Sequence, residues 1–232
     1  MITAFLDFDG VLFDTAKEAY LLARYAFYGV SPFEEINNAE YQKFYQNKYL
    51  VTNSWQYYYL MKSLEFEKIE KKFNQFIKNR INDDLIFDKK FQTCRKDLMQ
   101  NHFDFWNSLD KPYPFFDEFK KLQNSLNIII VSTKNQKAIY ERLKQLDFNL
   151  PLEKIIGKEI LEHYKSKGEF LNEYITKNNI QSAIFVDDSQ ENLYSCKNIK
   201  GLELFLASWG YSNPKYIGKN CDEIIKIIKE KV

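Results

Sequence analysis

The residues of this sequence best suited to chemistry are acidic, and they stand directly after short apolar stretches. Asp7 and Asp9 follow the apolar run at the N-terminus and are separated by a single residue, Phe8. Asp187 and Asp188 follow a second apolar run in the last quarter of the chain. Carboxylates held close together raise one another's pKa unless a cation neutralises them, so these two pairs, if they meet, indicate a metal site.

The chemistry open to such a group of acids is that of a hard cation and a phosphate. Oxygen ligands without His or Cys suit Mg²⁺ rather than zinc. One aspartate can accept a phosphoryl group as an aspartyl phosphate. A second acid two residues later can protonate the leaving group and afterwards activate water. Asp7 and Asp9 have the spacing for this division of labour.

Hydroxyl groups and ammonium groups that could hold a phosphoryl group occur elsewhere in the chain. Ser132 and Thr133 follow a third apolar run, and a loop before a helical pattern carries Lys165 and Lys167. Such donors bind phosphoryl oxygens and offset charge in the transition state. The residue types alone leave the lysine open between Lys165 and Lys167, with Lys158 also near.

Short apolar runs bounded by turn residues predict the strands that position these groups. The expected strands are residues 2–6, 127–131, 182–186, 202–207 and, more weakly, 155–156. Helical patterns lie between them at 116–126, 136–146 and 168–176. This alternation predicts an α/β fold with a doubly wound, Rossmann-like parallel sheet, in which ligands bind at the carboxyl ends of the strands.

One long region, residues 15–109, interrupts the alternation and has no convincing strand pattern. Its expected helices are residues 17–28, 34–49, 54–64, 67–77 and 88–106. Two prolines in the segment 111–114 then stop the last helix. We therefore expect a catalytic core of residues 1–14 and 110–232 with an all-helical cap of residues 15–109 inserted in it.

Four segments together resemble the motifs of the haloacid-dehalogenase-like (HAD) hydrolase superfamily. They are Asp-Phe-Asp-Gly-Val-Leu-Phe-Asp-Thr at 7–15, Val-Ser-Thr-Lys-Asn at 131–135, Lys-Gly-Glu-Phe-Leu at 167–171 and Phe-Val-Asp-Asp-Ser-Gln-Glu-Asn at 185–192. Their order and spacing match over essentially the whole chain. The helical insertion stands where the family's C1-type cap stands, so the chain is identified as a member of the phosphatase branch.

The resemblance implies a role for each matching residue. Asp7 would be the nucleophile and a Mg²⁺ ligand, and Asp9 the general acid and base, lending its backbone carbonyl to the metal. The phosphate-binding residues would be Ser132, Thr133 and Lys167, and the further metal ligands Asp188 with Asp187 beside it. Two positions depart from the pattern: Asn192 stands where many members have an acid, and Phe115 where many have Gly.

The expected function is a Mg²⁺-dependent phosphatase that hydrolyses a small phosphorylated metabolite, a sugar phosphate or similar phosphomonoester, through an aspartyl phosphate. Two alternatives stay open. A phosphomutase of the same family would use the same intermediate and return the phosphate to the sugar. A non-catalytic phosphate-binding or signalling module is the other, although receiver domains lack the Asp-x-Asp-Gly start and a large helical insertion.

Composition limits the partners. The 232 residues carry 33 basic and 32 acidic side chains, which gives no basic surplus for nucleic acid. No apolar run approaches the roughly 18 residues needed to span a bilayer. Cys94, Cys196 and Cys221 form no metal-binding spacing. We expect a cytoplasmic enzyme acting on a small-molecule phosphate ester; the oligomeric state is open, and the size is compatible with a monomer.

Overall fold

The computed structural model describes residues 2–232, and the chain divides into two compact units. One unit, the core, comprises the residues up to Asp14 together with Pro112–Val232. The other, the helical cap, comprises Thr15–Lys111. The sequence places the second boundary at 109/110, whereas the units divide at 111/112.

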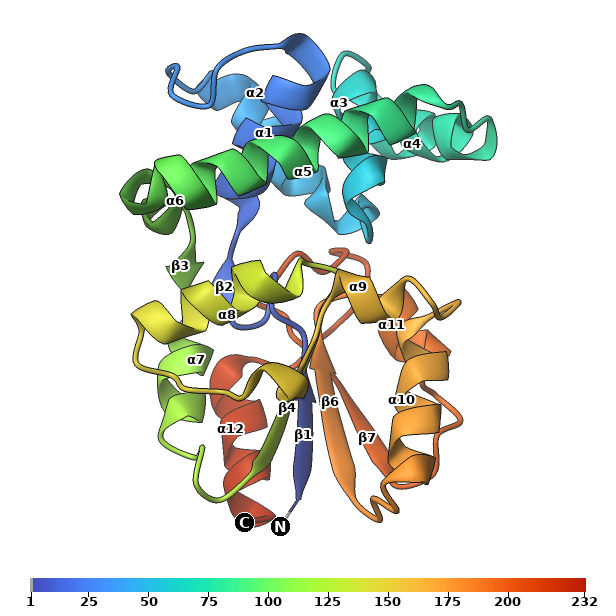
Figure 1. Cartoon of the computed structure of the whole chain (residues 1–232). Coiled ribbons are helices and arrows are strands. Elements are labelled where there is room, and N and C mark those ends of the chain that lie inside the picture. The colour runs from blue at the N-terminus through green and yellow to red at the C-terminus, as the bar shows by residue number, and fades with distance from the viewer. Residues whose placement is uncertain (1) are drawn as a thin grey trace. The chain divides into compact units, whose positions relative to one another are not determined.

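The core is built on a five-stranded parallel sheet (Figure 1). The strands are β1 (Thr3–Leu6), β4 (Asn127–Val131), β5 (Ile155–Ile156), β6 (Ala183–Asp187) and β7 (Leu202–Leu206). They lie in the order β5-β4-β1-β6-β7, so β1 is central. Every residue of β1 is buried, which is why three apolar residues follow Thr3 in a row instead of alternating with polar ones.

The register of the sheet brings the ends of three strands level. Leu6 of β1 pairs with Ile130 of β4 and with Val186 of β6. The residues that follow these positions therefore emerge at the same edge of the sheet. They include Asp7 after β1 and Asp187 at the end of β6.

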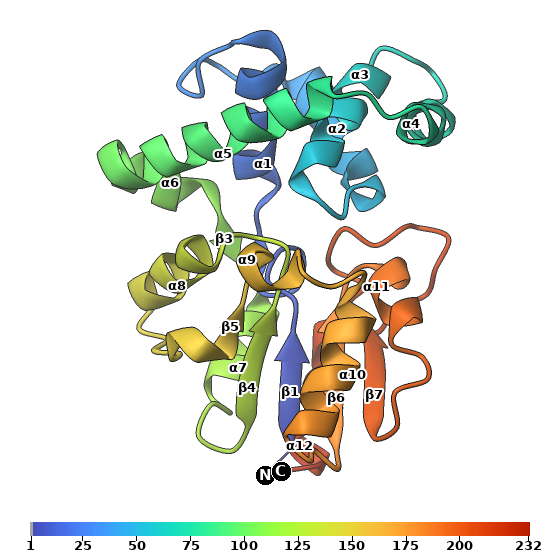
Figure 2. The same ribbon diagram turned by 45° about the vertical axis from the view of Figure 1, so that its right-hand side comes forward.

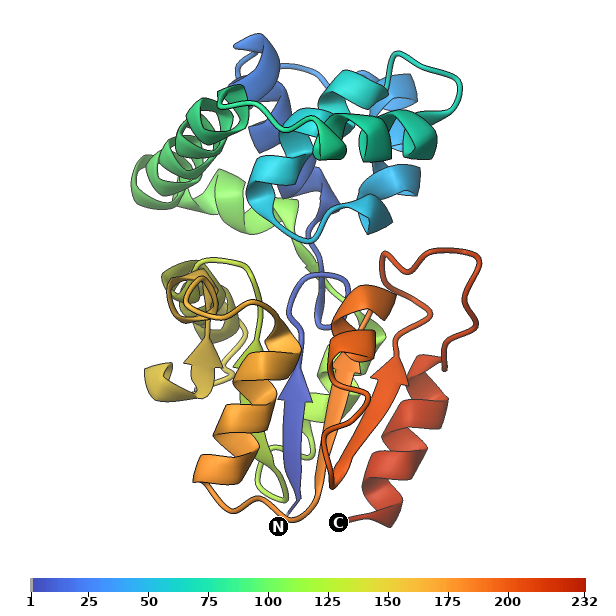
Figure 3. The same ribbon diagram turned by 90° about the vertical axis from the view of Figure 1, so that its right-hand side faces the viewer.

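Helices cover both faces of the sheet (Figures 2 and 3). On one face, Ile130 and Val186 belong to a buried cluster with residues of α7 (Pro114–Lys120), α8 (Gln136–Gln145) and α12 (Cys221–Glu230). On the other face, Ile129 and Phe185 pack with residues of α9 (Lys158–Leu161), α10 (Lys167–Lys177) and α11 (Gln190–Ser195). A short 3₁₀ turn, η3 (Leu152–Lys154), precedes β5. The predicted α/β class and doubly wound core are thus confirmed.

Two short strands lie where the chain passes between the units. These are β2 (Phe13–Asp14) and β3 (Lys111–Pro112), and they pair with each other. The prolines at 112 and 114 suit this place, since Pro114 is the first residue of α7. The helix predicted at 116–126 is wrong at both ends: α7 begins at Pro114 and ends at Lys120.

Apart from Lys111 of β3, the regular elements of the cap are all helices. Its helices are α1 (Ala16–Tyr28), α2 (Asn38–Asn47), α3 (Tyr57–Ser63), α4 (Ile69–Lys78), α5 (Asp83–Asn101) and α6 (Phe103–Leu109), with the 3₁₀ turns η1 (Lys48–Leu50) and η2 (Ser54–Gln56). Two predicted helices are corrected. The helix expected at 34–49 begins only at Asn38, because the Asn37 side chain caps it by accepting from the N–H groups of Ala39 and Glu40.

The helix expected at 88–106 begins earlier, at Asp83, and is two helices that meet at His102, whose φ of −138° is not helical. Within the cap, Glu18 of α1 is fully buried and accepts hydrogen bonds from Arg95 of α5 and Trp106 of α6. This contact fixes three helices to one another.

Among residues 2–232, no helix combines the length and the apolar character needed to cross a bilayer.

Candidate active site

Asp7 continues the central strand by one residue and is held there by the backbone. Its N–H donates to the carbonyl of Val186 at 2.9 Å. Its carboxylate Oδ1 accepts from the N–H of Phe8 at 2.7 Å, and the residue is only 7% exposed. The carboxylate is therefore fixed at the carboxyl end of β1.

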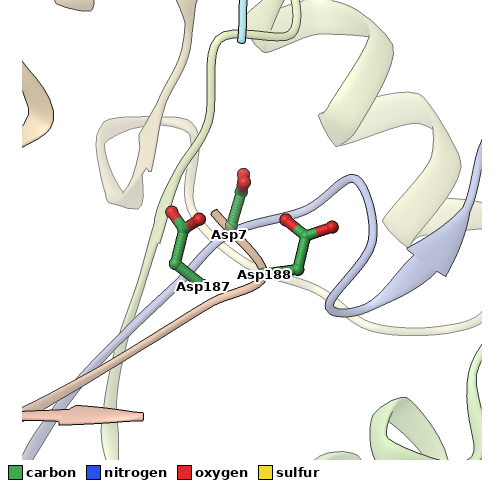
Figure 4. Close-up of side chains that lie close together, drawn as sticks. All are labelled: Asp7, Asp187 and Asp188. Atoms are coloured by element: carbon green, nitrogen blue, oxygen red, sulfur yellow. The ribbon is translucent and has the colours of Figure 1, made fainter. Parts of the chain in front are cut away.

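Two more carboxylates join Asp7 from the neighbouring strand. Asp187 is the last residue of β6, and Asp188 follows it. One carboxylate oxygen from each of the three acids lies within 4.8 Å of the others, and all three residues are buried. Figure 4 shows the three side chains reaching to the same side of the ribbon. Such an oxygen-only set matches the ligands that Mg²⁺ prefers.

Lys167 meets this cluster from the first turn of α10. Ser166 caps the helix by accepting from the N–H of Glu169, which places Lys167 at the start of the helix. The Lys167 ammonium lies 3.0 Å from Asp7 Oδ2 and 2.8 Å from Asp187 Oδ2. Of the lysines that the sequence left open, Lys165 is exposed, whereas Lys167 is buried.

Asn192 explains one departure from the family pattern. Its amide donates to both oxygens of Asp187 at 3.1 Å, and the N–H of Ser189 donates to Asp187 Oδ1 at 2.8 Å. An ionised acid at position 192 could not donate these bonds. The amide thus holds Asp187 in the orientation in which it meets Lys167.

The electrostatics of the site depend on the burial of its charges. Burial raises the pKa of Asp7 from 3.8 to about 6; Lys167 opposes this shift, while Asp187 and Asp9 add to it. Burial by itself would lower the pKa of Lys167, but the charges of Asp187 and Asp7 outweigh it and raise that pKa. One ammonium thus offsets only part of the negative charge around it. The uncompensated negative charge favours the binding of a cation.

Asp9 lies in a tight loop between β1 and β2. Gly10, next to it, has φ of +84°, a conformation that favours glycine. The Asp9 side chain is 26% exposed, and its Oδ1 lies 3.3 Å from the ammonium of Lys134. Lys134 itself is buried and was not singled out by sequence reasoning.

The predicted hydroxyl donors stand on the strand next to β1. Ser132 follows β4, is 1% exposed, and its N–H donates to the carbonyl of Ile156 at 2.9 Å. Its Oγ accepts from the N–H of Lys134 at 3.4 Å. Thr133 is partly buried beside it. The structure therefore brings Asp7, Asp187, Asp188 and Lys167 together directly, and sets Ser132 and Asp9 on adjacent loops that share Lys134.

A loop after β7 supports the site and was also missed. The N–H of Tyr211 donates to Asp188 Oδ2 at 2.6 Å, and the indole of Trp209 donates to the carbonyl of Val11 at 3.0 Å. A side chain on Gly210 would lie 2.1 Å from the carbonyl of Gly10. The only signal in the sequence was the aromatic-glycine-aromatic run itself, which does not reveal what it contacts.

Comparison with known proteins decides the family. The model of the haloacid dehalogenase-like hydrolases matches residues 4–202. The chain belongs to this family. The four motif segments of this HAD hydrolase lie within the matched range, so the resemblance seen in the sequence and the prediction of a hydrolase are confirmed. No match was found among curated proteins.

Solved structures share the fold of this HAD hydrolase over nearly its whole length. A predicted phosphatase from Clostridium acetobutylicum is 15% identical with a TM-score of 0.64, covering 99% of this chain and 98% of its own. A predicted phosphoglycolate phosphatase from Haemophilus somnus 129PT is 14% identical with a TM-score of 0.61, covering 97% of each chain. A hydrolase from Pseudomonas syringae is 11% identical with a TM-score of 0.62, covering 99% of each. At these identities the likeness shows the fold.

Proposed function

We propose that this HAD hydrolase is a Mg²⁺-dependent phosphatase of small phosphorylated metabolites, with Asp7 as its nucleophile. The observation that carries the proposal is the contact of Lys167 with Asp7 inside a cluster of three buried carboxylates. An anionic nucleophile, a fixed ammonium and a set of oxygen ligands are what phosphoryl transfer requires. The names of two similar structures, a predicted phosphoglycolate phosphatase and a predicted phosphatase, agree with it.

The residues present fit the metal that the family implies. Asp7 and Asp188 would provide carboxylate oxygens, together with the backbone carbonyl of Asp9. Asp187 completes the cluster, although hydrogen bonds from Lys167, Ser189 and Asn192 already occupy its two oxygens. When bound, Mg²⁺ would neutralise charge on the transferred phosphoryl group.

The chain's own residues would carry the reaction in two steps. The Asp7 carboxylate attacks phosphorus, the bond to the ester oxygen breaks, and Asp9 gives its proton to the departing alcohol. Asp9 then takes a proton from water, which attacks the aspartyl phosphate and releases inorganic phosphate and free Asp7. Lys167 and Ser132 hold the phosphoryl oxygens throughout, with Thr133 beside them.

The test is phosphate release from p-nitrophenyl phosphate and from a panel of sugar phosphates and other small phosphomonoesters, with and without Mg²⁺. We expect release that needs Mg²⁺ and falls at least about a hundredfold in Asp7→Asn. Asp117→Asn, an exposed acid in the first turn of α7, is the matched control and should behave as the wild type. Retention of even a tenth of the activity by Asp7→Asn would overturn the assignment of the nucleophile.

The product analysis separates the alternatives. Conversion of a hexose phosphate to its isomer without phosphate release would identify a phosphomutase. Absence of both reactions in folded protein with Mg²⁺ would point to a non-catalytic role.

A further inference from the structure

Tyr211 contacts two separate parts of the core at once. Its backbone N–H donates to Asp188 Oδ2 at 2.6 Å, and its phenol hydroxyl donates to Asp14 Oδ1 at 2.6 Å. Asp188 belongs to the carboxylate cluster, whereas Asp14 is the last core residue before the chain enters the cap. A single residue therefore joins the candidate metal ligand to the connecting strand β2.

The packing around Tyr211 leaves little freedom for this link. A side chain on Gly10 would lie 2.0 Å from Asp188 Oδ2 and 2.8 Å from the ring of Tyr211. A side chain on Gly210 would lie 2.6 Å from Asp188 Cβ. The backbone at Gly10 and the backbone at Gly210 thus both pack directly against the Asp188 side chain. We expect a movement of either loop to shift the Asp188 carboxylate.

The hydrogen bond to Asp188 has a direct consequence for its carboxylate. A carboxylate oxygen that accepts a backbone N–H is fixed in orientation, and the other oxygen then faces a defined direction. The Tyr211 N–H can hold Asp188 only while its loop stays in place. Two side chains of that loop anchor it: Trp209 at Val11, and Tyr211 at Asp14.

We propose that Tyr211 is a positioning residue that couples the connecting strand at Asp14 to the Mg²⁺ ligand Asp188. The proposal rests on the proposed function, because it assigns Asp188 to Mg²⁺. By this coupling, a change in the connecting strand alters the affinity of the core for Mg²⁺, and bound Mg²⁺ favours one arrangement of the strand. In this role Tyr211 acts through Asp188, to which its N–H donates.

The test measures Mg²⁺ binding by calorimetry in Tyr211→Phe, which removes the hydroxyl and keeps the backbone N–H. We expect the Kd for Mg²⁺ to rise about three- to tenfold, the range for one lost hydrogen bond. The kcat at saturating Mg²⁺ should stay close to that of the wild type. Tyr216→Phe makes the same chemical change in the same loop on a side chain that is 49% exposed, and it should leave the Kd unchanged.

Asp14→Ala tests the link from its other end, because it removes the oxygen that accepts from the Tyr211 hydroxyl. It should weaken Mg²⁺ binding in the same direction, and the double variant should bind Mg²⁺ no more weakly than Tyr211→Phe alone, because both changes remove the same hydrogen bond. A wild-type Kd in both single variants would overturn the coupling. A merely structural Tyr211 would lower the melting temperature without changing the Kd of the folded protein, and this too would overturn it.

The outcomes separate this inference from the proposed function. If the wild type binds Mg²⁺ and hydrolyses phosphate esters while the variants bind equally well, only the coupling fails. If Asp188→Asn abolishes binding and Tyr211→Phe weakens it, the coupling is supported. If the wild type binds no Mg²⁺, both proposals fail together.

Discussion

The ammonium of Lys167 lies 3.0 Å from Asp7 Oδ2 and stands between it and Asp187. This arrangement sets the charge of the site before any metal binds. One buried cation meets several buried carboxylates, so the pKa of Asp7 stays raised at about 6 in spite of Lys167. The remaining negative charge must be neutralised by a proton or by a cation.

Competition between the proton and Mg²⁺ gives the first prediction. Below a pH of about 6, Asp7 in the metal-free protein is protonated and must lose its proton before it can bind Mg²⁺. The Mg²⁺ affinity should therefore fall about tenfold for each pH unit below this value and level off above about pH 7. Calorimetry in two buffers of different ionisation enthalpy should show proton release on binding at low pH only. A constant affinity between pH 5 and pH 7 would contradict the raised pKa.

The same shift predicts that the Asp7 carboxylate destabilises the metal-free protein. Because the folded-state pKa of Asp7 lies above its ordinary value, the folded protein binds the proton more tightly, and its free energy of unfolding falls as the pH rises from 3.8 to about 6. Asp7→Asn removes this penalty and should raise the free energy of unfolding by about 2–3 kcal/mol near neutral pH. Urea denaturation without Mg²⁺ measures it. The gain should vanish near pH 4, and Asp117→Asn should show none; a gain that persists at low pH would have another cause.

Gly10 offers a test of the packing around Asp188. In Gly10→Ala the new methyl would lie 2.0 Å from Asp188 Oδ2, at a φ of +84°. Asp188 must then move, and we expect Mg²⁺ binding and activity to fall at least about a hundredfold. Gly29→Ala is the matched control, since its φ is +77° but nothing lies within 4 Å of the added carbon. It should cost about 1 kcal/mol of stability and leave activity intact. Equal activities in the two variants would contradict the clash.

The cap depends on the buried pair of Arg95 and Glu18, whose side chains are 9% and 0% exposed. Arg95→Met would leave the Glu18 carboxylate buried without its guanidinium partner. We expect a loss of about 3–5 kcal/mol in the free energy of unfolding of the cap. Lys121→Ala removes one partner of an exposed ion pair with Glu118, which water screens, and its effect on stability should be much smaller. Unfolding of both variants is followed by circular dichroism. Comparable losses of stability would show that burial does not determine how much an ion pair contributes.

Much of the core follows from the sequence because buried parallel strands read as continuous apolar runs. The runs ending at Leu6, Val131 and Val186 predicted three strands, and parallel pairing then required their polar successors to meet at one edge. In the cap the pattern was less informative. The helical pattern continues through Asn37 and His102. Only the hydrogen bonds of the Asn37 side chain show that a helix begins after it, and only the backbone angle of His102 shows that one helix ends and another begins there.

The supporting residues of the site could not be predicted for a different reason. Lys134 and Tyr211 act through contacts between distant parts of the chain, with Asp9 in one case and with Asp188 and Asp14 in the other. No local spacing reports such contacts. From the sequence alone, Lys134 looks like a lysine on the protein surface and Tyr211 like a tyrosine of the hydrophobic core.

The last prediction concerns the effect of Lys134 on Asp9. Its side chain is 1% exposed and its ammonium lies 3.3 Å from Asp9 Oδ1, so it holds the proposed acid and base by an ion pair. Lys134→Met keeps the length of the side chain and removes the charge, and we expect kcat to fall about tenfold or more because Asp9 is no longer held toward the leaving group. Mg²⁺ affinity should change much less, since Asp7 and Asp188 are untouched. Lys134→Arg should recover part of the rate, and Lys137→Met, on the exposed side of α8, should have no effect. A Lys134→Met variant with wild-type kcat, or one that loses Mg²⁺ binding in proportion to its rate, would show that Lys134 does not act through Asp9.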